Sequence, residues 1–437
     1  MEKATQIEKS IQMKFYAFLN RFSLDFSKPE KRFLQEMFYG ILCSQHVHAS
    51  KIGRYIKDRV SLKKTLKRLS YHLHKRGLWL RLQRSYLKNN RAKFSGSHYL
   101  VIDLGDITKQ YALKMEGLYR VHDGSRGGLG NGYWTVGVIG CQANPHKRDR
   151  LEIRPLYTEL FSYHMHQEGE YISENSKILN AMQEVEKGTG SRAYWVGDRG
   201  LGRRKIIDPC LQKGRRFIFR LDGRLNFWYE GRACNTREIS RQVVLDREHR
   251  ILKKHGNRFI WRQFRMGAVP VQWINEYSGE AQDYPLWLVV AKEKERGYSW
   301  FLVHSASQEI DQIIRDVAEG YSARWQIEEV YRHIKTQFHL EQVAYQKYEA
   351  LKNILPILWI ALSFVYNQVV ELAVDILGCK SLKINHNKPQ LPDLYRFIYY
   401  KLAEVVQRCF VRISHLKIFD RIFRDKICIN MQTELLF

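Results

Sequence analysis

Apolar side chains recur at helical spacing through residues 1–95. Over Lys31–Gln45 they fall three and four positions apart, at Phe33, Met37, Phe38, Ile41 and Leu42. Over Ser61–His74 leucines repeat in the same way, at Leu62, Leu66, Leu69 and Leu73. The pattern predicts a helical N-terminal domain.

From Ser97 onward short apolar runs replace the helical pattern. They are typical of β-strands and predict strands over His98–Ile102, Tyr133–Cys141, Glu152–Leu160, Ala193–Val196 and Phe217–Leu221. A helical segment lies among them at Ser173–Glu186, with Ser173 as its N-cap and Ser176 as an alternative. Strands that alternate with helices predict a mixed α/β sheet with helices on its faces.

Residues 222–298 break this alternation. Charged turns separate short β-like pieces, which predicts an all-β insertion with strands over Asn226–Tyr229, Gln242–Leu245, Phe259–Arg265, Val269–Ile274 and Pro285–Val290. The α/β pattern then resumes with a strand at Trp300–Val303, a helix around Glu309–Val317 and a second helix that contains Tyr321.

The rest of the chain predicts a helical C-terminal region. Its longest apolar run, Ile354–Tyr366, contains Pro356 and is too short to span a bilayer, so we expect a buried helix. A chain of 437 residues can form several domains. We predict four regions: 1–95 helical and basic, 96–221 with 299–345 catalytic α/β, 222–298 a β-rich insertion, and 346–437 helical.

Charge points to a polyanionic partner. The chain carries 72 Lys and Arg against 45 Asp and Glu, a formal net charge of +27. Within residues 51–100 there are 15 Lys and Arg and one acid, Asp58. The first domain is therefore a candidate DNA-binding module, of helix-turn-helix kind by hypothesis. A basic solvated bundle is the alternative, and an acidic membrane is the second candidate partner.

The seven cysteines are scattered and never spaced C-x-x-C. This argues against a disulfide scaffold or a zinc ribbon and favours a reducing cytosol. Met1–Gln12 is polar and mixed in charge, so no signal peptide is expected. We expect a cytoplasmic protein.

Four polar residues share one stripe of the helix around Tyr321. Tyr321, Arg324, Glu328 and Lys335 lie three, four and seven positions apart, which at roughly 100° per residue returns each to nearly the same angle. Ala323, Ile327, Val330 and Ile334 lie on the opposite side. The stripe is either a solvated charged face held by i,i+4 pairs or an arrangement that grips phosphates beside a metal-binding carboxylate.

Further carboxylates follow apolar strands. Asp103 follows one strand and Asp198 another, and strand ends facing a helix are where α/β folds gather a site. With Glu328 they would repel one another unless divalent cations neutralised them, and Mg²⁺ prefers such oxygens. Two ions about 4 Å apart can activate a nucleophile and stabilise the leaving oxygen of a phosphodiester. Each Asp alone is more often a turn residue or helix cap, and Asp106 is an alternative to Asp103.

These residues resemble the DDE-class transposases of bacterial insertion sequences. In the insertion sequence four family the signature is Tyr-x2-Arg-x3-Glu-x6-Lys, and here it reads Tyr321, Arg324, Glu328, Lys335 without departure. The resemblance runs from about Tyr99 to Leu372 and is weaker in the N-terminal domain and the tail. It implies a ribonuclease-H-like catalytic domain interrupted by a β-rich insertion.

The resemblance also implies roles. Asp103, Asp198 and Glu328 are expected to be catalytic and to bind two Mg²⁺ ions, for which Mn²⁺ can substitute. Tyr321, Arg324 and Lys335 are expected to hold DNA phosphates near the transposon end. Trp300 matches the position that captures a flipped base in members that cleave through a hairpin, with a buried strand-end Trp as the alternative.

Other polar groups carry weaker signals. The cluster Arg199, Arg203, Arg204 and Lys205 next to Asp198 is expected to contact the DNA backbone, with a charged helix start as the alternative. The Gly-rich Asp123–Gly132 lacks a G-K-[ST] ending and predicts a turn. Paired histidines, such as His46 and His48, lack a metal-ligand pattern.

The hypothesis is a Mg²⁺-dependent transposase that cuts at the ends of its own insertion sequence and transfers the 3′ ends into target DNA. Its partners would be double-stranded DNA at the inverted repeats and the target, bound by a homodimer in a paired-end complex, with no membrane. A catalytically silent DNA-binding descendant and a structure-specific nuclease on the same fold are the alternatives.

Overall fold

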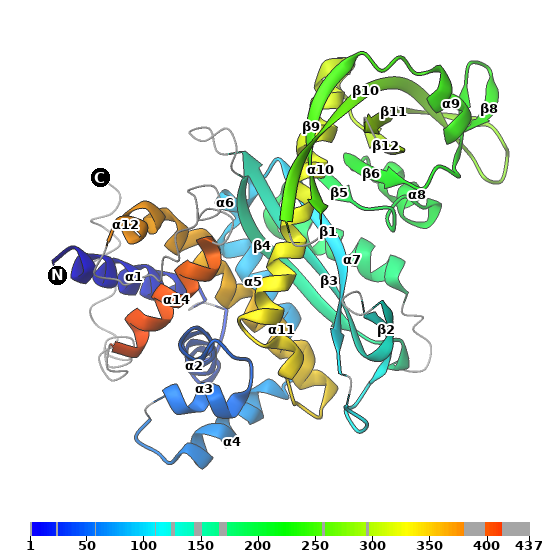
Figure 1. Cartoon of the computed structure of the whole chain (residues 1–437). Coiled ribbons are helices and arrows are strands. Elements are labelled where there is room, and N and C mark those ends of the chain that lie inside the picture. The colour runs from blue at the N-terminus through cyan, green and yellow to red at the C-terminus, as the bar shows by residue number, and fades with distance from the viewer. Residues whose placement is uncertain are drawn as a thin grey trace. The chain divides into compact units, whose positions relative to one another are not determined.

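A computed structural model gives the three-dimensional structure of the chain (Figure 1). It describes residues 2–22, 25–56, 58–109, 111–123, 127–143, 151–165, 173–255, 258–293, 297–379 and 398–412. These residues form two compact units. The first comprises the described parts of Met1–Asn89, Asp106–Tyr133 and Arg332–Phe437, and the second those of Asn90–Gly105 and Trp134–Tyr331.

The first unit is mainly helical, as the N-terminal pattern predicts. Its helices are α1 (Glu2–Asn20), α2 (Lys28–Ser44), α3 (Ala49–Tyr55), α4 (Leu62–Leu73), α5 (Leu78–Asn89), α11 (Tyr348–Phe364), α12 (Ala373–Gly378) and α14 (Ile398–Arg412). Phenylalanines from four of them meet in the core, at Phe15, Phe18, Phe38, Phe364 and Phe410. Strand β2 (Tyr119–Asp123) pairs with the first residues of β3 (Gly128–Ala143).

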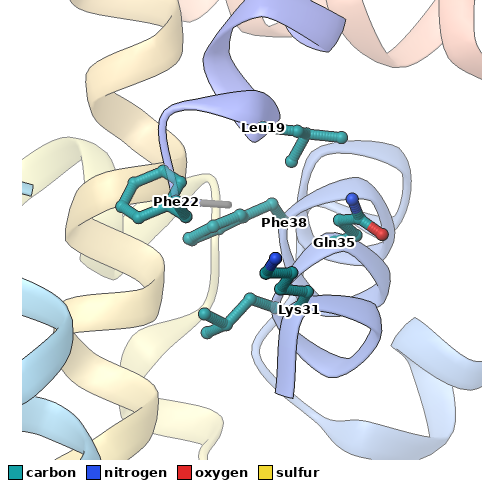
Figure 2. A pocket seen from close by; sticks show the side chains of 6 residues that line it. Leu19, Phe22, Lys31, Gln35 and Phe38 are labelled. Atoms are coloured by element: carbon teal, nitrogen blue, oxygen red, sulfur yellow. The ribbon is translucent and has the colours of Figure 1, made fainter. Parts of the chain in front are cut away.

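A pocket of about 20 Å³ lies between α1 and α2 of this unit. Figure 2 shows Leu19, Phe22 and Phe38 around it, with the polar side chains of Lys31 and Gln35. It has room for about one water molecule. We therefore assign it no ligand.

The apolar helix α11 is buried. Its residues Ile354 to Phe364 all lie in the core, and π- and 3-10-helical turns, η3 (Val365–Val369) and η4 (Val370–Leu372), join it to α12. By length and composition alone the longer helical stretch Tyr348–Ile376 could cross a membrane, because the helical backbone extends beyond the predicted run at both ends. The prediction of a buried helix is confirmed. Since 72% of its most apolar window is buried inside the protein, packing accounts for its character.

The second unit contains the predicted α/β sheet. Its strands run in the order β3-β1-β5-β6-β12-β11-β10-β7-β8, with β4 on β3 and β9 on β10. The bounds are β1 (Tyr99–Thr108), β4 (Leu151–Phe161), β5 (Tyr194–Gly197), β6 (Phe217–Leu221), β7 (Asn226–Tyr229), β8 (Arg232–Asn235), β9 (Arg247–His255), β10 (Arg258–Ile274), β11 (Ala281–Glu293) and β12 (Tyr298–His304). Its helices are α6 (Arg91–Ser95), α7 (Glu174–Thr189), α8 (Arg204–Gln212), α9 (Thr236–Gln242) and most of α10 (Ile310–Thr336). A mixed α/β fold of this kind is consistent with a ribonuclease-H-like domain.

Helices cover both faces of the central strands. Successive strand residues point to opposite faces of the sheet, and the neighbours Tyr194 and Trp195 show what covers each face. Trp195 donates a hydrogen bond to Glu186 of α7, whereas Tyr194 stacks near Tyr99, whose hydroxyl donates to Glu319 of α10. Helix α7 therefore covers one face and α10 the other.

Local signals explain several elements. Ser173 caps α7 as predicted, because its hydroxyl accepts the backbone N–H of Ser176. The predicted strands Phe217–Leu221 and Asn226–Tyr229 match β6 and β7. Asp103 lies within β1 rather than at its end, since pairing extends the strand to Thr108.

Two other predictions are wrong. Gln242–Leu245 is no strand: a capping box of Asn235 and Glu238 starts α9 at Thr236, that helix ends at Gln242, and β9 begins only at Arg247. The two helices predicted on either side of Gly320 are one helix, α10. A Cβ at Gly320 would lie 3.0 Å from Tyr99 and Ile218, so glycine lets this helix approach the sheet.

Other predictions stay open. The proposed domain boundaries at 95, 221, 298 and 345 stay predictions. Residues 124–126 of the predicted Gly-rich turn lie outside the described residues, as do residues 380–397 and 413–437 of the predicted helical tail.

Candidate active site

Strand register aligns Asp103 with Asp198. Strands β1 and β5 are parallel, with Val101 opposite Val196. Each aspartate lies two residues further along its chain, so both reach the same level of the sheet and leave it on the same face. That is the face covered by α10.

The same row continues into β6 and β12. Val196 pairs with Ile218 in β6, which brings Arg220 level with Asp198. Its Nη1 lies 3.7 Å from Asp198 Oδ1. Across the next pair of strands Arg220 is opposite Phe301. Two acids, one cation and one aromatic ring thus form a single row beneath the helix.

Tyr321 of α10 packs onto this row. Its hydroxyl donates to Asp198 Oδ1 at 3.4 Å and accepts from Arg220 Nη1 at 3.0 Å. Its ring meets Phe301 edge-on at 4.8 Å between centroids. Since Tyr321 is only 1% exposed, its phenol fixes the positions of Asp198 and Arg220.

Arg324 links the two remaining acids. Its Nη1 donates to Glu328 Oε1 at 2.9 Å and lies 4.0 Å from Asp103 Oδ2. The guanidinium also lies over the Trp325 ring, 3.8 Å from its centroid. Burial alone lowers the pKa of Arg324, but Tyr321 and the three nearby carboxylates raise it above its usual value, so this buried cation stays charged.

The electrostatics of Asp103 reflect how close the three acids lie. Burial raises the pKa of Asp103 most, and the neighbouring charges of Glu328 and Asp198 raise it further. The Arg324 cation and a hydrogen bond from the Leu104 N–H act against them, and the pKa settles at about 7. A carboxyl that titrates so high lies among like charges in a poorly solvated place.

Burial decides between the two interpretations of the helix stripe. Tyr321 and Arg324 are 1% and 2% exposed and contact the sheet residues Asp198 and Asp103. A solvated charged face would leave them in water. That interpretation is therefore wrong for these two residues, while Ala323, Ile327, Val330 and Ile334 are buried as predicted.

Lys335 and Asp106 lie together in the first unit. Lys335 Nζ lies 3.0 Å from Asp106 Oδ2 and 3.1 Å from Glu341 Oε1. Asp106 also accepts a hydrogen bond from the Thr108 hydroxyl. The alternative acid to Asp103 is thus a partner of the signature lysine.

The predicted DNA-binding arginines differ in their surroundings. Arg199 is exposed next to Asp198, whose Oδ1 accepts its backbone N–H. Arg203 Nη2 lies 3.2 Å from Glu174 Oε2 of α7, and Arg204 begins α8 with its guanidinium over Trp273. A charged helix start thus describes Arg204, while the exposed Arg199 can reach a ligand.

Trp300 is half-buried in β12, opposite Leu221 at the end of β6. A Cβ at Gly223, whose φ is +86°, would lie 2.8 Å from the Trp300 ring. The indole Nε1 is buried and has no hydrogen-bond partner among the described residues. Trp300 lies at the same end of the strands as Asp198 but on the opposite face of the sheet, because its neighbour Phe301 faces Tyr321 of α10.

The acids suit a hard divalent cation by chemistry, since all three offer carboxylate oxygens and their mutual repulsion would fall on binding one. Within the described ranges, however, no three His, Cys, Asp or Glu side chains are grouped closely enough to hold an ion. At Glu328 one carboxylate oxygen is already occupied, because Arg324 donates a hydrogen bond to Oε1. Asp103, Asp198 and Glu328 offer the donor atoms that such an ion prefers, but as these described side chains lie here they do not form a metal site.

The sequence analysis did not identify two residues of the site, Arg220 and Trp325. The register of β5 with β6 brings Arg220 level with Asp198, and no local pattern in the sequence marks it. Trp325 lies next to a signature residue but off the predicted stripe, and it contacts Arg324.

Comparison with known proteins agrees with this geometry. Residues 176–364 match the family model described as a transposase DDE domain. The match includes Asp198, the whole Tyr321–Lys335 signature and α11, and Asp103 precedes it. No curated protein matches the chain. The match supports a DDE transposase, a class of enzyme that acts on DNA and generally uses divalent metal ions.

Proposed function

We propose that this protein is a cut-and-paste transposase of the insertion sequence four family. It would cleave DNA at the ends of its own insertion sequence and transfer the freed 3′ ends into target DNA. The observation that carries the proposal is the shared register of Asp103 and Asp198 under the helix that supplies Glu328. The complete Tyr-Arg-Glu-Lys signature supports the family.

In this proposal Asp103, Asp198 and Glu328 hold divalent ions, Mg²⁺ or Mn²⁺. When bound, these ions supply Lewis-acid activation of water or a 3′-hydroxyl and stabilise the leaving oxygen. Tyr321 and Arg220 fix the Asp198 carboxylate. Arg324 holds Glu328 and offsets the charge of Asp103, and on release it can contact a phosphate.

Arg199, Arg203 and Lys335 are each proposed to contact the DNA backbone, and Arg203 is paired with Glu174 of α7. Trp300 is proposed to stack on a base near the cleaved end, because an indole near the end of a strand offers a flat apolar face. Two transposon ends must be brought together for joint transfer, so a homodimer on paired ends is the proposed assembly. The site of action would be the bacterial nucleoid.

The test is strand cleavage and joining by the full chain on a duplex that carries the element's end, with Mg²⁺ or Mn²⁺. Wild type should cut at the terminus and join the product to a second duplex. Glu328→Gln should bind the duplex and do neither. Cutting without joining would favour a nuclease, and binding without cutting under either metal would favour a catalytically silent descendant.

A further inference from the structure

Strand β9 pairs with the first half of β10 in an antiparallel ribbon (Figure 1), and β11 joins the other side of β10 from Phe264 onward. One tryptophan on it, Trp261, is 54% exposed. Every other tryptophan of the described residues is buried or half-buried. A single exposed apolar side chain is common on protein surfaces, so the significance of Trp261 depends on the charged side chains that share its face.

The register defines which side chains share the outward face with Trp261. Trp261, Gln263 and Arg265 alternate along β10, and opposite them in β9 lie Leu252, Arg250 and Glu248. Arg250 is exposed and forms no ion pair with a described residue. The Arg265 side chain is 72% exposed, with Glu248 3.7 Å away. We call Trp261, Arg250 and Arg265 the outward ribbon face.

The inward face of the same ribbon is used by the fold. Phe264 and Ile251 are buried there, and Lys253 lies 3.0 Å from Glu293 of β11. The backbone N–H of Leu252 donates to the Ser322 hydroxyl of α10. The ribbon is thus held by its inward side, which leaves the outward side rigid and available.

The charge of the ribbon indicates which kind of molecule its outward face binds. From Arg247 to Arg265 the chain has seven Lys and Arg and one acid, Glu248. Three of these cations, Arg247, Lys253 and Arg262, lie next to Asp311 or Glu293, whereas Arg250 and Arg265 lie on the outward face. Such an excess suits a polyanion. A two-stranded β-ribbon fits the major groove of a DNA duplex, where arginines can contact phosphates and an aromatic ring can contact sugars and bases.

We propose that the outward ribbon face binds duplex DNA, with Arg250 and Arg265 on phosphates and Trp261 against the groove. The inference rests on the proposed function for its DNA substrate and adds a contact surface separate from the acidic site. A contact of this kind sets affinity and leaves the chemistry at Asp103, Asp198 and Glu328 unchanged.

The experiment measures binding of the full chain to a fluorescein-labelled duplex of random sequence at several salt concentrations. Trp261→Ala should weaken binding about five- to tenfold. Arg250→Gln with Arg265→Gln should lower the salt slope by about 2, since each neutralised phosphate contributes about 0.9 to that slope. Trp261→Phe should retain part of the affinity. All three side chains are exposed on the outward face, so thermal unfolding should hardly change.

Two matched controls lie in the same unit. Tyr277→Ala removes a 98% exposed ring from the turn between β10 and β11, and Arg224→Gln removes a guanidinium that is 84% exposed next to Asp222. Neither should alter affinity by more than about twofold, beyond the small loss expected from one distant charge.

The outcomes separate this inference from the proposed function. Unchanged affinity and salt slope in the Trp261 and arginine variants would overturn the inference, even if wild type cleaves DNA. A change in oligomeric state with unchanged DNA affinity would also overturn it, since the face would then bind protein. If the variants lose DNA affinity and the wild-type protein never cleaves DNA, the inference stands and the proposed chemistry does not.

Discussion

The hydroxyl of Tyr321 joins the acid and the cation of the central row, donating to Asp198 and accepting from Arg220. A buried phenol between a carboxylate and a guanidinium fixes both, because each bond restricts the other's rotation. The signature tyrosine therefore acts on the site through Asp198. A direct phosphate contact by Tyr321 would need its surroundings to open.

The first prediction tests this role. Tyr321→Phe keeps the ring against Phe301 and removes only the hydroxyl, so unfolding free energy should fall by about 1 kcal/mol. Cleavage at saturating DNA should fall by more than tenfold, while DNA affinity stays within about twofold. Single-turnover cleavage beside a binding titration measures both. Loss of affinity with unchanged cleavage would instead make Tyr321 a DNA contact.

The second prediction concerns the support of Trp300. In Gly223→Ala the alanine must adopt a positive φ of +86°, and its Cβ would lie 2.8 Å from the Trp300 ring. Gly231→Ala has a similar φ of +76° and open space around the new methyl group, so it isolates the backbone cost, about 1 kcal/mol. We expect Gly223→Ala to be destabilised further, by about 1–2 kcal/mol more.

Urea denaturation of the two glycine variants measures this difference. If the proposed base contact of Trp300 is correct, Gly223→Ala should also reduce cleavage and Gly231→Ala should not. Equal stabilities of the two variants would show that the ring moves aside freely and that Gly223 does not position it.

The third prediction concerns acid stability of the helical first unit. Burial raises the pKa of Glu30, but hydrogen bonds from Arg81 and from the Ser27 backbone and hydroxyl outweigh it and lower the pKa to about 2. A lowered pKa stabilises the folded state above the ordinary value near 4.5, and this stabilisation is lost as pH falls from about 4.5 to 2.

Glu30→Gln should therefore lower the unfolding free energy by about 1–3 kcal/mol at pH 7. The gap to wild type should shrink below pH 4.5 and close near pH 2. Asp283→Asn removes an acid on β11 that pairs with no described residue, and it should change stability little. Urea denaturation at pH 7, 4 and 3 is the measurement, and a gap that stays constant over this range would contradict the role given to Glu30.

Local patterns predicted much of the fold. Short apolar runs between turns placed β6 and β7 to the residue, and a capping serine placed the start of α7. The errors arose where a tertiary contact outweighed local pattern. Gly320 weakens a helix locally, but it lets α10 lie against Tyr99, so the helix continues. Strand β10 runs through Met266–Ala268, a span with no strand in the prediction, because pairing with β11 extends it.

The residues of the candidate site also fall into those with a local sequence pattern and those that depend on long-range contacts. The apolar runs before the two aspartates and the helical spacing of Glu328 predict Asp103, Asp198 and Glu328 as site residues, although Asp103 lies inside β1 and not at its end. Arg220 carries no such mark, since its place depends on which strands pair and in what register. The burial of Arg324 between Glu328 and Asp103 is equally invisible in one helix. Long-range pairing is what the sequence alone does not specify.

The most direct test of the central claim is Mn²⁺ binding followed by electron paramagnetic resonance. The full chain would be mixed with an end-bearing duplex and compared with Asp103→Asn, Asp198→Asn and Glu328→Gln. If the three acids share one site, each single variant should lose the same saturable Mn²⁺ signal. Wild-type Mn²⁺ binding in all three variants would contradict a shared metal site.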